Sequence, residues 1–196
     1  RRHDMRMTGS DGSAADVVRV RNDRLIGIAR TELLAILQRH AEKAGVALEF
    51  GARRSADELD ADLVIAADGV SSATRENGPF GGRVTTGRGL YLWAGTEFAL
   101  PDALFAPVTT EHGVFVTHAY PYSAERSTFL VETDETTWRR AGFAEIDVAP
   151  EASDEVSLRY LERAFAEQLG GRRLIGNRTR WLRFRTVTCE RWSAGR

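Results

Sequence analysis

The sequence of 196 residues predicts an α/β protein, α+β overall, in which part of a doubly wound layer is followed by an antiparallel sheet with helices. Two observations predict this fold class. A helical pattern over 31–44 precedes the run 63–67, which is apolar on both faces, as in a central strand of a covered parallel sheet. From residue 90 onward, strand candidates follow one another with short turns between them, which is typical of antiparallel pairing.

In the first part of the chain the apolar residues of 31–44 repeat at helical spacing. Thr31 is the expected N-cap of this helix, and Gly45 is its expected stop. The strand candidates around the helix are at 5–7, 17–21, 46–50 and 63–67. Glycine and proline then gather in 76–89 without any periodicity, which indicates a crossing between domains.

The second part begins with five strand candidates, at 90–96, 104–110, 113–122, 127–133 and 179–188. A short helix is predicted over 134–143. A longer helix is predicted to begin at a Ser153 cap and to end at Gly170, with the apolar stripe Val156, Leu161, Phe165 and Leu169. We therefore expect three segments: 1–78 in the doubly wound layer, 79–187 in the antiparallel sheet, and 188–196 returning to the first layer.

Composition excludes several functions. The net charge of −1 and a pI of about 6.5 argue against nucleic-acid and membrane-surface partners. No apolar run reaches the ~18 residues of a membrane span, and a single cysteine fits a reducing cytoplasm. The histidines and Cys189 have no metal-ligand spacing, and no serine or cysteine nucleophile motif is present, so no catalytic residue can be named.

The stretch DADLVIAADGVSSATR, residues 60–75, is the first candidate site. Ligands of parallel sheets lie beyond the carboxyl ends of the strands, where Asp68 and Gly69 fall. Glycine permits a close approach of the backbone, and the aspartate can accept hydrogen bonds from sugar hydroxyls. A plain turn after a strand explains the same residues equally well. Arg30 lies at the start of a predicted helix, where the helix dipole disfavours a cation. Either a bound anion or an arginine side chain that extends into water would remove this conflict.

Taken together, IARTELLAILQRHAEKAG at 28–45 and DLVIAADGVSSATR at 62–75 resemble the class A flavoprotein monooxygenases, which have the para-hydroxybenzoate hydroxylase fold. The stretches YLWAGT, 111–143 and NRTRWLRFRTV are similar to those of members that hydroxylate salicylyl-CoA or 2-aminobenzoyl-CoA. They are more distantly similar to the tryptophan hydroxylase of violacein biosynthesis. The resemblance begins near residue 20, and the block 111–143 is its most specific part.

This resemblance implies FAD and NAD(P)H as cofactors and a partial FAD-binding, Rossmann-like layer. It implies that Arg30 contacts FAD, that Asp68 and Gly69 serve both cofactors, and that Arg75 contacts the phosphates of the nicotinamide dinucleotide. The family's GxGxxG turn and its GDA segment are absent from the sequence. We therefore expect an internal portion of a longer protein, inactive by itself, whose partners are the remaining segments of that protein.

The substrate implied by the resemblance is a small aromatic compound, such as an aryl-CoA thioester, hydroxylated with O₂. In 113–122, His118 and Tyr120 share a strand face and are candidates for binding it, although both also fit a hydrogen-bonded core. Trp93 is expected in the core. The arginines of 172–196 could receive CoA phosphates or could form a solvated strand face. The alternatives are another flavin enzyme of this fold, such as a halogenase or isoprenoid reductase, and a non-catalytic remnant or binding module.

Overall fold

The computed structural model describes residues 4–9, 18–21 and 26–195. The chain divides into two compact units. One unit contains Arg1–Ala35 and Arg88–Arg183, and the other contains Ile36–Gly87 and Phe184–Arg196. The three segment boundaries expected from the sequence stay a prediction.

One mostly antiparallel sheet dominates the described residues, and its strands run in the order β2-β1-β4-β5-β6-β3-β7, with β8 also paired to β3. The strands are β1 (Met5–Met7), β2 (Val18–Val20), β3 (Arg83–Thr96), β4 (Ala103–Thr110), β5 (Gly113–Pro121), β6 (Ser127–Thr133), β7 (Leu174–Ile175) and β8 (Trp181–Thr188). The ribbon of β1 and β2 is antiparallel as expected, and β1 joins the sheet by parallel pairing with β4. The four strands β4, β5, β6 and β3 therefore form the centre of the sheet.

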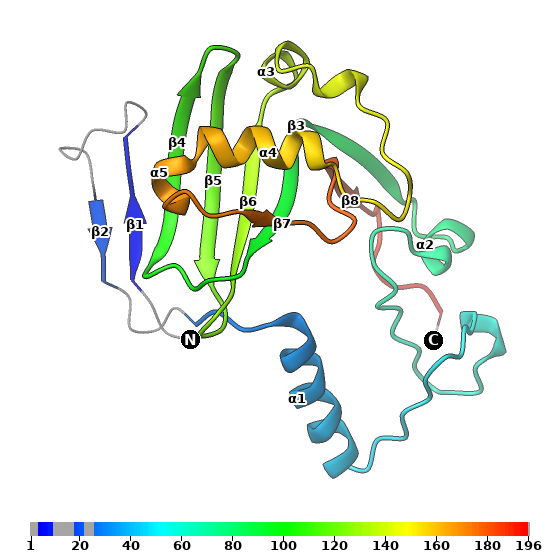
Figure 1. Ribbon diagram of the computed structural model, residues 1–196. Helices are drawn as coiled ribbons and strands as arrows, with labels where there is room; N and C mark the ends of the chain where they lie inside the picture. Colours follow the sequence, from blue (N-terminus) through cyan, green and yellow to red (C-terminus); the bar gives the residue numbers. More distant parts are fainter. Residues whose placement is uncertain (1–3, 10–17, 22–25, 196) are drawn as a thin grey trace. The chain divides into compact units, whose positions relative to one another are not determined.

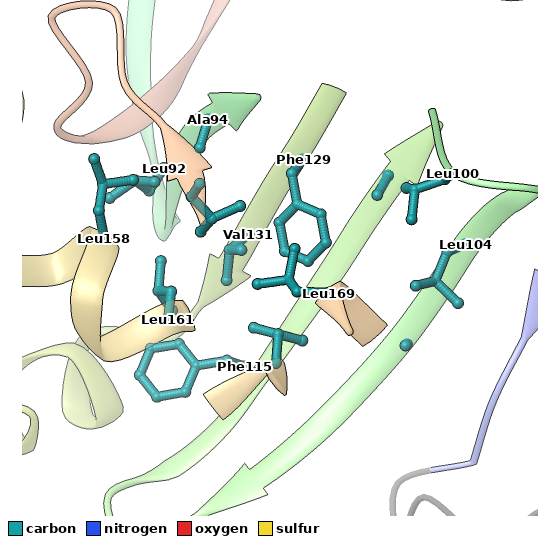
Figure 2. Close-up of a cluster of buried hydrophobic side chains, with 14 of the residues drawn as sticks. Leu92, Ala94, Leu100, Leu104, Phe115, Phe129, Val131, Leu158, Leu161 and Leu169 are labelled. Carbon is teal, nitrogen blue, oxygen red and sulfur yellow. The ribbon is translucent and has the colours of Figure 1, made fainter. Parts of the chain in front are cut away.

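Helices cover one face of this sheet, as Figure 1 shows for α4 (Glu155–Ala164) and α5 (Ala166–Leu169). The apolar stripe of these helices packs on inward-facing strand residues. Phe115, Phe129, Leu161, Phe165 and Leu169 are fully buried there, and most of this cluster appears in Figure 2. Burial of one such side chain stabilises a fold by about 1.5–3 kcal/mol, so this cluster fixes which face of the sheet is closed.

The longer helix differs from the sequence prediction at its start. Its N-cap is Asp154, not Ser153, and Asp154 Oδ1 accepts a hydrogen bond of 2.9 Å from the Ser157 N–H. Ser153 is engaged elsewhere, because its Oγ accepts from the Thr179 N–H at 3.1 Å. Val156, expected in the buried stripe, is 52% exposed, whereas the predicted stop at Gly170 is confirmed by a left-handed φ of 60°.

Two smaller helical segments complete the unit. Helix α3 (Glu135–Arg140) is capped by Asp134, and the 3₁₀ turn η3 (Phe143–Glu145) follows it. The short helix predicted from the sequence over 134–143 is thus present, in two pieces. Phe143 is buried against the sheet and stacks on Trp181, with ring centroids 5.5 Å apart.

The other unit has less regular structure. Helix α1 (Arg30–Lys43) runs into it, and it also contains η2 (Ala56–Glu58) and α2 (Ala73–Asn77). The strands predicted at 46–50 and 63–67 are wrong, because neither segment joins a ladder among the described residues. A strand requires a hydrogen-bonded neighbour, and the side chains of Phe50 and Ile65 remain 69% and 80% exposed.

The predicted crossing at 76–89 is also partly wrong. Strand β3 begins at Arg83 and passes through Gly87 and Gly89 without interruption. At Gly87 an added Cβ would lie 3.3 Å from the Phe184 carbonyl oxygen. Glycine here permits close approach of β3 and β8, so this residue supports a strand and does not interrupt one.

Candidate functional site

The corner that follows the extended run 63–67 is built by three short-range interactions. Gly69 has a φ of +81°, which allows the chain to reverse, and its carbonyl accepts from the Ser72 N–H at 3.1 Å. Ser72 then caps α2, because its Oγ accepts from the Arg75 N–H at 3.0 Å. The Asp68 carboxylate faces the same turn, where its Oδ2 lies 3.4 Å from the Thr74 N–H.

The Asp68 carboxylate is ionised at neutral pH. Hydrogen bonding from the Ser72 side chain, followed by that from the Thr74 N–H, holds the pKa of Asp68 below its ordinary value of 3.8, although desolvation acts in the opposite direction. This carboxylate is therefore an acceptor for hydroxyl or amide donors. An added Cβ at Gly69 would meet no atom within 4 Å, so the backbone there is open to a ligand.

Arg75 closes the corner. Its Nη1 donates to the Gly69 carbonyl oxygen at 3.0 Å, and its Nη2 donates to the carbonyl oxygen of Val70. Three of the four predicted cofactor-binding residues, Asp68, Gly69 and Arg75, thus meet in one corner. Arg30 is exposed in the first turn of α1 and belongs to the other compact unit. Its convergence with this corner stays a prediction.

A cavity of about 700 Å³ opens beside the corner, within one compact unit. Its walls are the run 63–66, the corner itself, Phe80, alternating residues of 185–191 and the consecutive residues 192–195. Three guanidinium groups line it, from Arg75, Arg185 and Arg191, against the single carboxylate of Asp68. Its volume lies within the range of 300–1,000 Å³ that is usual for small-molecule and cofactor sites. The excess of positive charge suits an anionic ligand, because guanidinium groups bind phosphate oxygens in a bidentate manner.

Sequence reasoning missed the C-terminal wall of this cavity. Arg185 donates to Ser71 Oγ at 2.8 Å and so attaches β8 to the corner. Arg191, Cys189 and the 75%-exposed Trp192 also line the cavity. The available signal was the arginine-rich composition of 172–196, but that composition does not distinguish residues that line the cavity from residues on the rest of the sheet.

Three other arginines of this segment, Arg178, Arg180 and Arg183, have protein partners. Arg178 pairs with Glu151 at 2.8 Å, and Arg183 pairs with Glu135 at 2.9 Å. Arg180 donates to the backbone carbonyl oxygens of Ala149 and Pro150. The structure therefore favours the interpretation of these arginines as parts of the protein surface over a single phosphate-binding cluster.

A second hollow of about 770 Å³ shares Asp68, Thr74 and Phe80 with the first. Its basic residues are Arg53 and Arg54, and Arg54 is already paired with Glu49 at 2.7 Å. This hollow therefore has less free positive charge than the cavity at the corner.

The face of the sheet opposite the helices is uncovered in its own unit. His118 is exposed there and Tyr120 is half-buried, while Phe115, Thr117 and Ala119 point into the core. The predicted alternation is thus confirmed, and the interpretation of His118 as a core residue is not supported. His118 packs against the rings of Phe105, at a centroid distance of 5.0 Å, and Tyr120, at 5.9 Å.

Trp93 was expected in the core, and this expectation is wrong. It is 51% exposed on the same open face as His118, opposite Leu130 in the β3–β6 ladder. The reason is that side chains alternate between the two faces of a strand. Leu92 and Ala94 point to the covered face of β3, so Trp93 points to the open face.

Within the described residues, no histidine, cysteine, aspartate and glutamate side chains form a group of three or more that could hold a metal ion. None of the described helices combines the length and the apolar character that a bilayer crossing needs.

The chain is similar to known monooxygenases. Salicyloyl-CoA 5-hydroxylase of a Streptomyces species is 36% identical over 88% of this chain and 34% of its own length. A 3-hydroxy-4-methyl-anthranilyl-[aryl-carrier protein] 5-monooxygenase of Streptosporangium sibiricum is 41% identical over 88% of this chain and 44% of its own length. Protodeoxyviolaceinate monooxygenase of Chromobacterium violaceum is 30% identical over 88% of this chain and 46% of its own length. The chain thus spans between a third and a half of these relatives. No family model matches it.

Solved structures agree on the fold. 2-Methyl-3-hydroxypyridine-5-carboxylic acid oxygenase matches 98% of this chain and 54% of its own chain, with a TM-score of 0.57 and 16% identity. A flavin-dependent brominase matches 99% of this chain and 54% of its own chain, with a TM-score of 0.52 and 11% identity. The predicted fold class, α/β and α+β overall with an antiparallel sheet, is confirmed. The resemblance to monooxygenases of aromatic substrates is confirmed as well.

Proposed function

We propose that this chain, similar to aromatic monooxygenases over most of its length, is the central portion of a flavin-dependent monooxygenase that hydroxylates an aromatic acyl thioester. The single observation that carries the proposal is the cavity at the Asp68 corner, where three guanidinium groups face one ionised carboxylate. This donor and acceptor set fits a ligand with both phosphates and hydroxyl groups, as FAD and NAD(P)H have.

The residues of the corner divide the binding between them. Arg75 and Arg185 supply positive charge for phosphate oxygens, and Asp68 accepts from ribityl or ribose hydroxyls. Gly69 offers open backbone for close approach. Arg30, at the start of α1, would satisfy its unfavourable position by binding an anionic part of FAD. Bound flavin supplies the redox and oxygen chemistry, so no catalytic dyad of protein residues is required.

The open face of the sheet is the proposed cover of the substrate ring. His118 and Tyr120 offer hydrogen-bonding groups beside the apolar surface of Phe105 and Leu130. The substrates printed in the names of two relatives, a salicyloyl-CoA and an anthranilyl carrier-protein conjugate, are aromatic acyl groups attached to large carriers. An apolar face with hydrogen-bonding groups suits the aromatic ring of such a substrate, and the carrier would extend beyond this face of the sheet.

The remaining segments of the full-length protein are the proposed partners that complete the flavin site. The runs 46–50 and 63–67 are rich in apolar residues and have no ladder partners among the described residues. Leu63 and Ile65 are 68% and 80% exposed, so segments of the full-length protein that pack on them would bury apolar surface. We expect flavin to bind the full-length protein much more tightly than residues 1–196 alone.

The experiment that tests the function is NAD(P)H oxidation by the full-length, flavin-loaded protein. Salicylyl-CoA or 2-aminobenzoyl-CoA should stimulate oxidation and yield an oxygen-dependent hydroxylated product. Benzoyl-CoA and free salicylate serve as comparison substrates. Failure of every aryl thioester to stimulate oxidation or to yield product would overturn the proposal, and a halide-dependent product would favour a halogenase.

A further inference from the structure

The open face of the central sheet consists of aligned rows of side chains. Trp93 lies opposite Leu130, which lies opposite His118, which lies opposite Phe105. The adjacent row is Tyr91, Glu132, Val116 and Pro107. Leu130 is only 8% exposed although it lies on this face, while Trp93 beside it is 51% exposed. The first row therefore forms a shallow apolar floor with an aromatic side wall.

This face carries few charged side chains. Its side chains come from four strands: Tyr91, Trp93 and Gly95; Thr128, Leu130 and Glu132; Val114, Val116, His118 and Tyr120; and Phe105, Pro107 and Thr109. No lysine or arginine is among them, and Glu132 is the sole carboxylate in this set. Glu132 is exposed, and no ion pair involving it occurs among the described residues.

Under the proposed function, a substrate that closes this face would remove water from the exposed Glu132 carboxylate, which would then need a hydrogen-bond donor. A buried carboxylate without a donor is strongly unfavourable, whereas one that accepts a hydrogen bond is stabilised. Glu132 lies two residues from Leu130, a separation of about 6.8 Å along the strand. A ring on the Leu130 floor can therefore direct a substituent toward Glu132.

We propose that Glu132 is a specificity-determining residue of the substrate face: it accepts a hydrogen bond from a hydroxyl or amino group on the ring and repels a free ring carboxylate. This inference rests on the proposed function and names the substrate more narrowly. The preferred substrate is an aromatic acyl group that is uncharged because it is held as a thioester, and whose ring carries a hydrogen-bond donor. A free aromatic acid meets no lysine or arginine among these side chains and meets a like charge at Glu132.

The test compares three ligands on the full-length, flavin-loaded protein: 2-hydroxybenzoyl-CoA, benzoyl-CoA and free 2-hydroxybenzoate. Binding is measured by calorimetric titration without NAD(P)H. We expect the wild-type protein to bind the hydroxylated thioester about tenfold more tightly than benzoyl-CoA, because a hydrogen bond to a charged acceptor is at stake. Glu132→Gln should reduce this preference to within about threefold and should also strengthen binding of the free acid.

The matched control is Glu125→Gln, which removes the same charge from an exposed position in the turn between β5 and β6. It should leave all three affinities within about twofold of the wild type. Unchanged ligand preference in Glu132→Gln, with normal flavin content, would overturn the role of Glu132 while leaving the proposed function intact. Equal wild-type affinity for the two thioesters would overturn it without any variant. If the wild-type protein neither binds nor hydroxylates any thioester, the proposed function itself fails.

Discussion

Removal of the Asp154 carboxylate tests how the covered side of the sheet is held together. Asp154 is 3% exposed and binds Ser157 twice, from the Ser157 N–H at 2.9 Å and from the Ser157 Oγ at 2.6 Å. Ser157 Oγ in turn accepts from Trp181 Nε1 at 2.9 Å. The chain Asp154, Ser157, Trp181 thus connects the start of α4 to β8, and Asp154→Ala breaks it at its first member.

The magnitude follows from these two hydrogen bonds. Loss of an N-cap costs about 1 kcal/mol, and loss of a buried hydrogen bond to a charged group costs about 1.5–3 kcal/mol. We therefore expect Asp154→Ala to lower the free energy of unfolding by about 2–4 kcal/mol. Ser157→Ala removes the Oγ–Asp154 bond but keeps the backbone N–H that donates to Asp154. Because both single variants lose the bond between the two side chains, the double variant should cost at least about 0.5 kcal/mol less than the sum of the two single variants.

The measurement is urea unfolding of the full-length protein, followed by tryptophan fluorescence, because Trp181 reports on this chain of hydrogen bonds. The exposed Asp147 provides the control, and Asp147→Ala should change stability by less than about 0.5 kcal/mol. An Asp154→Ala variant as stable as the control, or strict additivity with Ser157→Ala, would refute the reasoning.

Two other predictions concern the corner and the cap of α3. Arg75→Ala should raise the Kd of the full-length protein for NAD(P)H about tenfold, measured by fluorescence titration. The control Arg39→Ala, at an exposed position, should leave this Kd unchanged. Equal effects of the two variants would contradict the assignment of Arg75 to the phosphates. The Thr137 N–H, and after it the Thr137 hydroxyl, hold the pKa of Asp134 below its ordinary value of 3.8. Because the pKa is lower in the folded state, this stabilisation is complete above the unfolded value and is lost as the pH falls through the folded value. Asp134→Asn should therefore flatten the decline of stability below about pH 4, measured by urea unfolding between pH 5 and pH 2, and an unchanged decline would exclude this role.

Local sequence determined the elements whose causes lie within a few residues. The alternation of 113–122 correctly separated His118 and Tyr120 from Phe115 and Thr117, because successive side chains of a strand must point to opposite faces. Gly170 ended the helix because its left-handed φ is readily available only to glycine. Asp68 and Gly69 likewise formed a corner through contacts with residues three to six positions away.

Tertiary structure decided the features that depend on distant partners. Asp154 replaced Ser153 as the cap because Thr179, 26 residues away, occupies Ser153 Oγ. Trp93 is exposed because the helices cover the other face of β3, and Arg185 reaches the cavity because β8 returns to Ser71. The run 63–67 has the composition of a buried strand, but composition supplies no hydrogen-bonded neighbour. Backbone preferences and the alternation of strand side chains depend on adjacent residues. Strand pairing, burial and the convergence of charged groups depend on which remote segments the folded chain brings together.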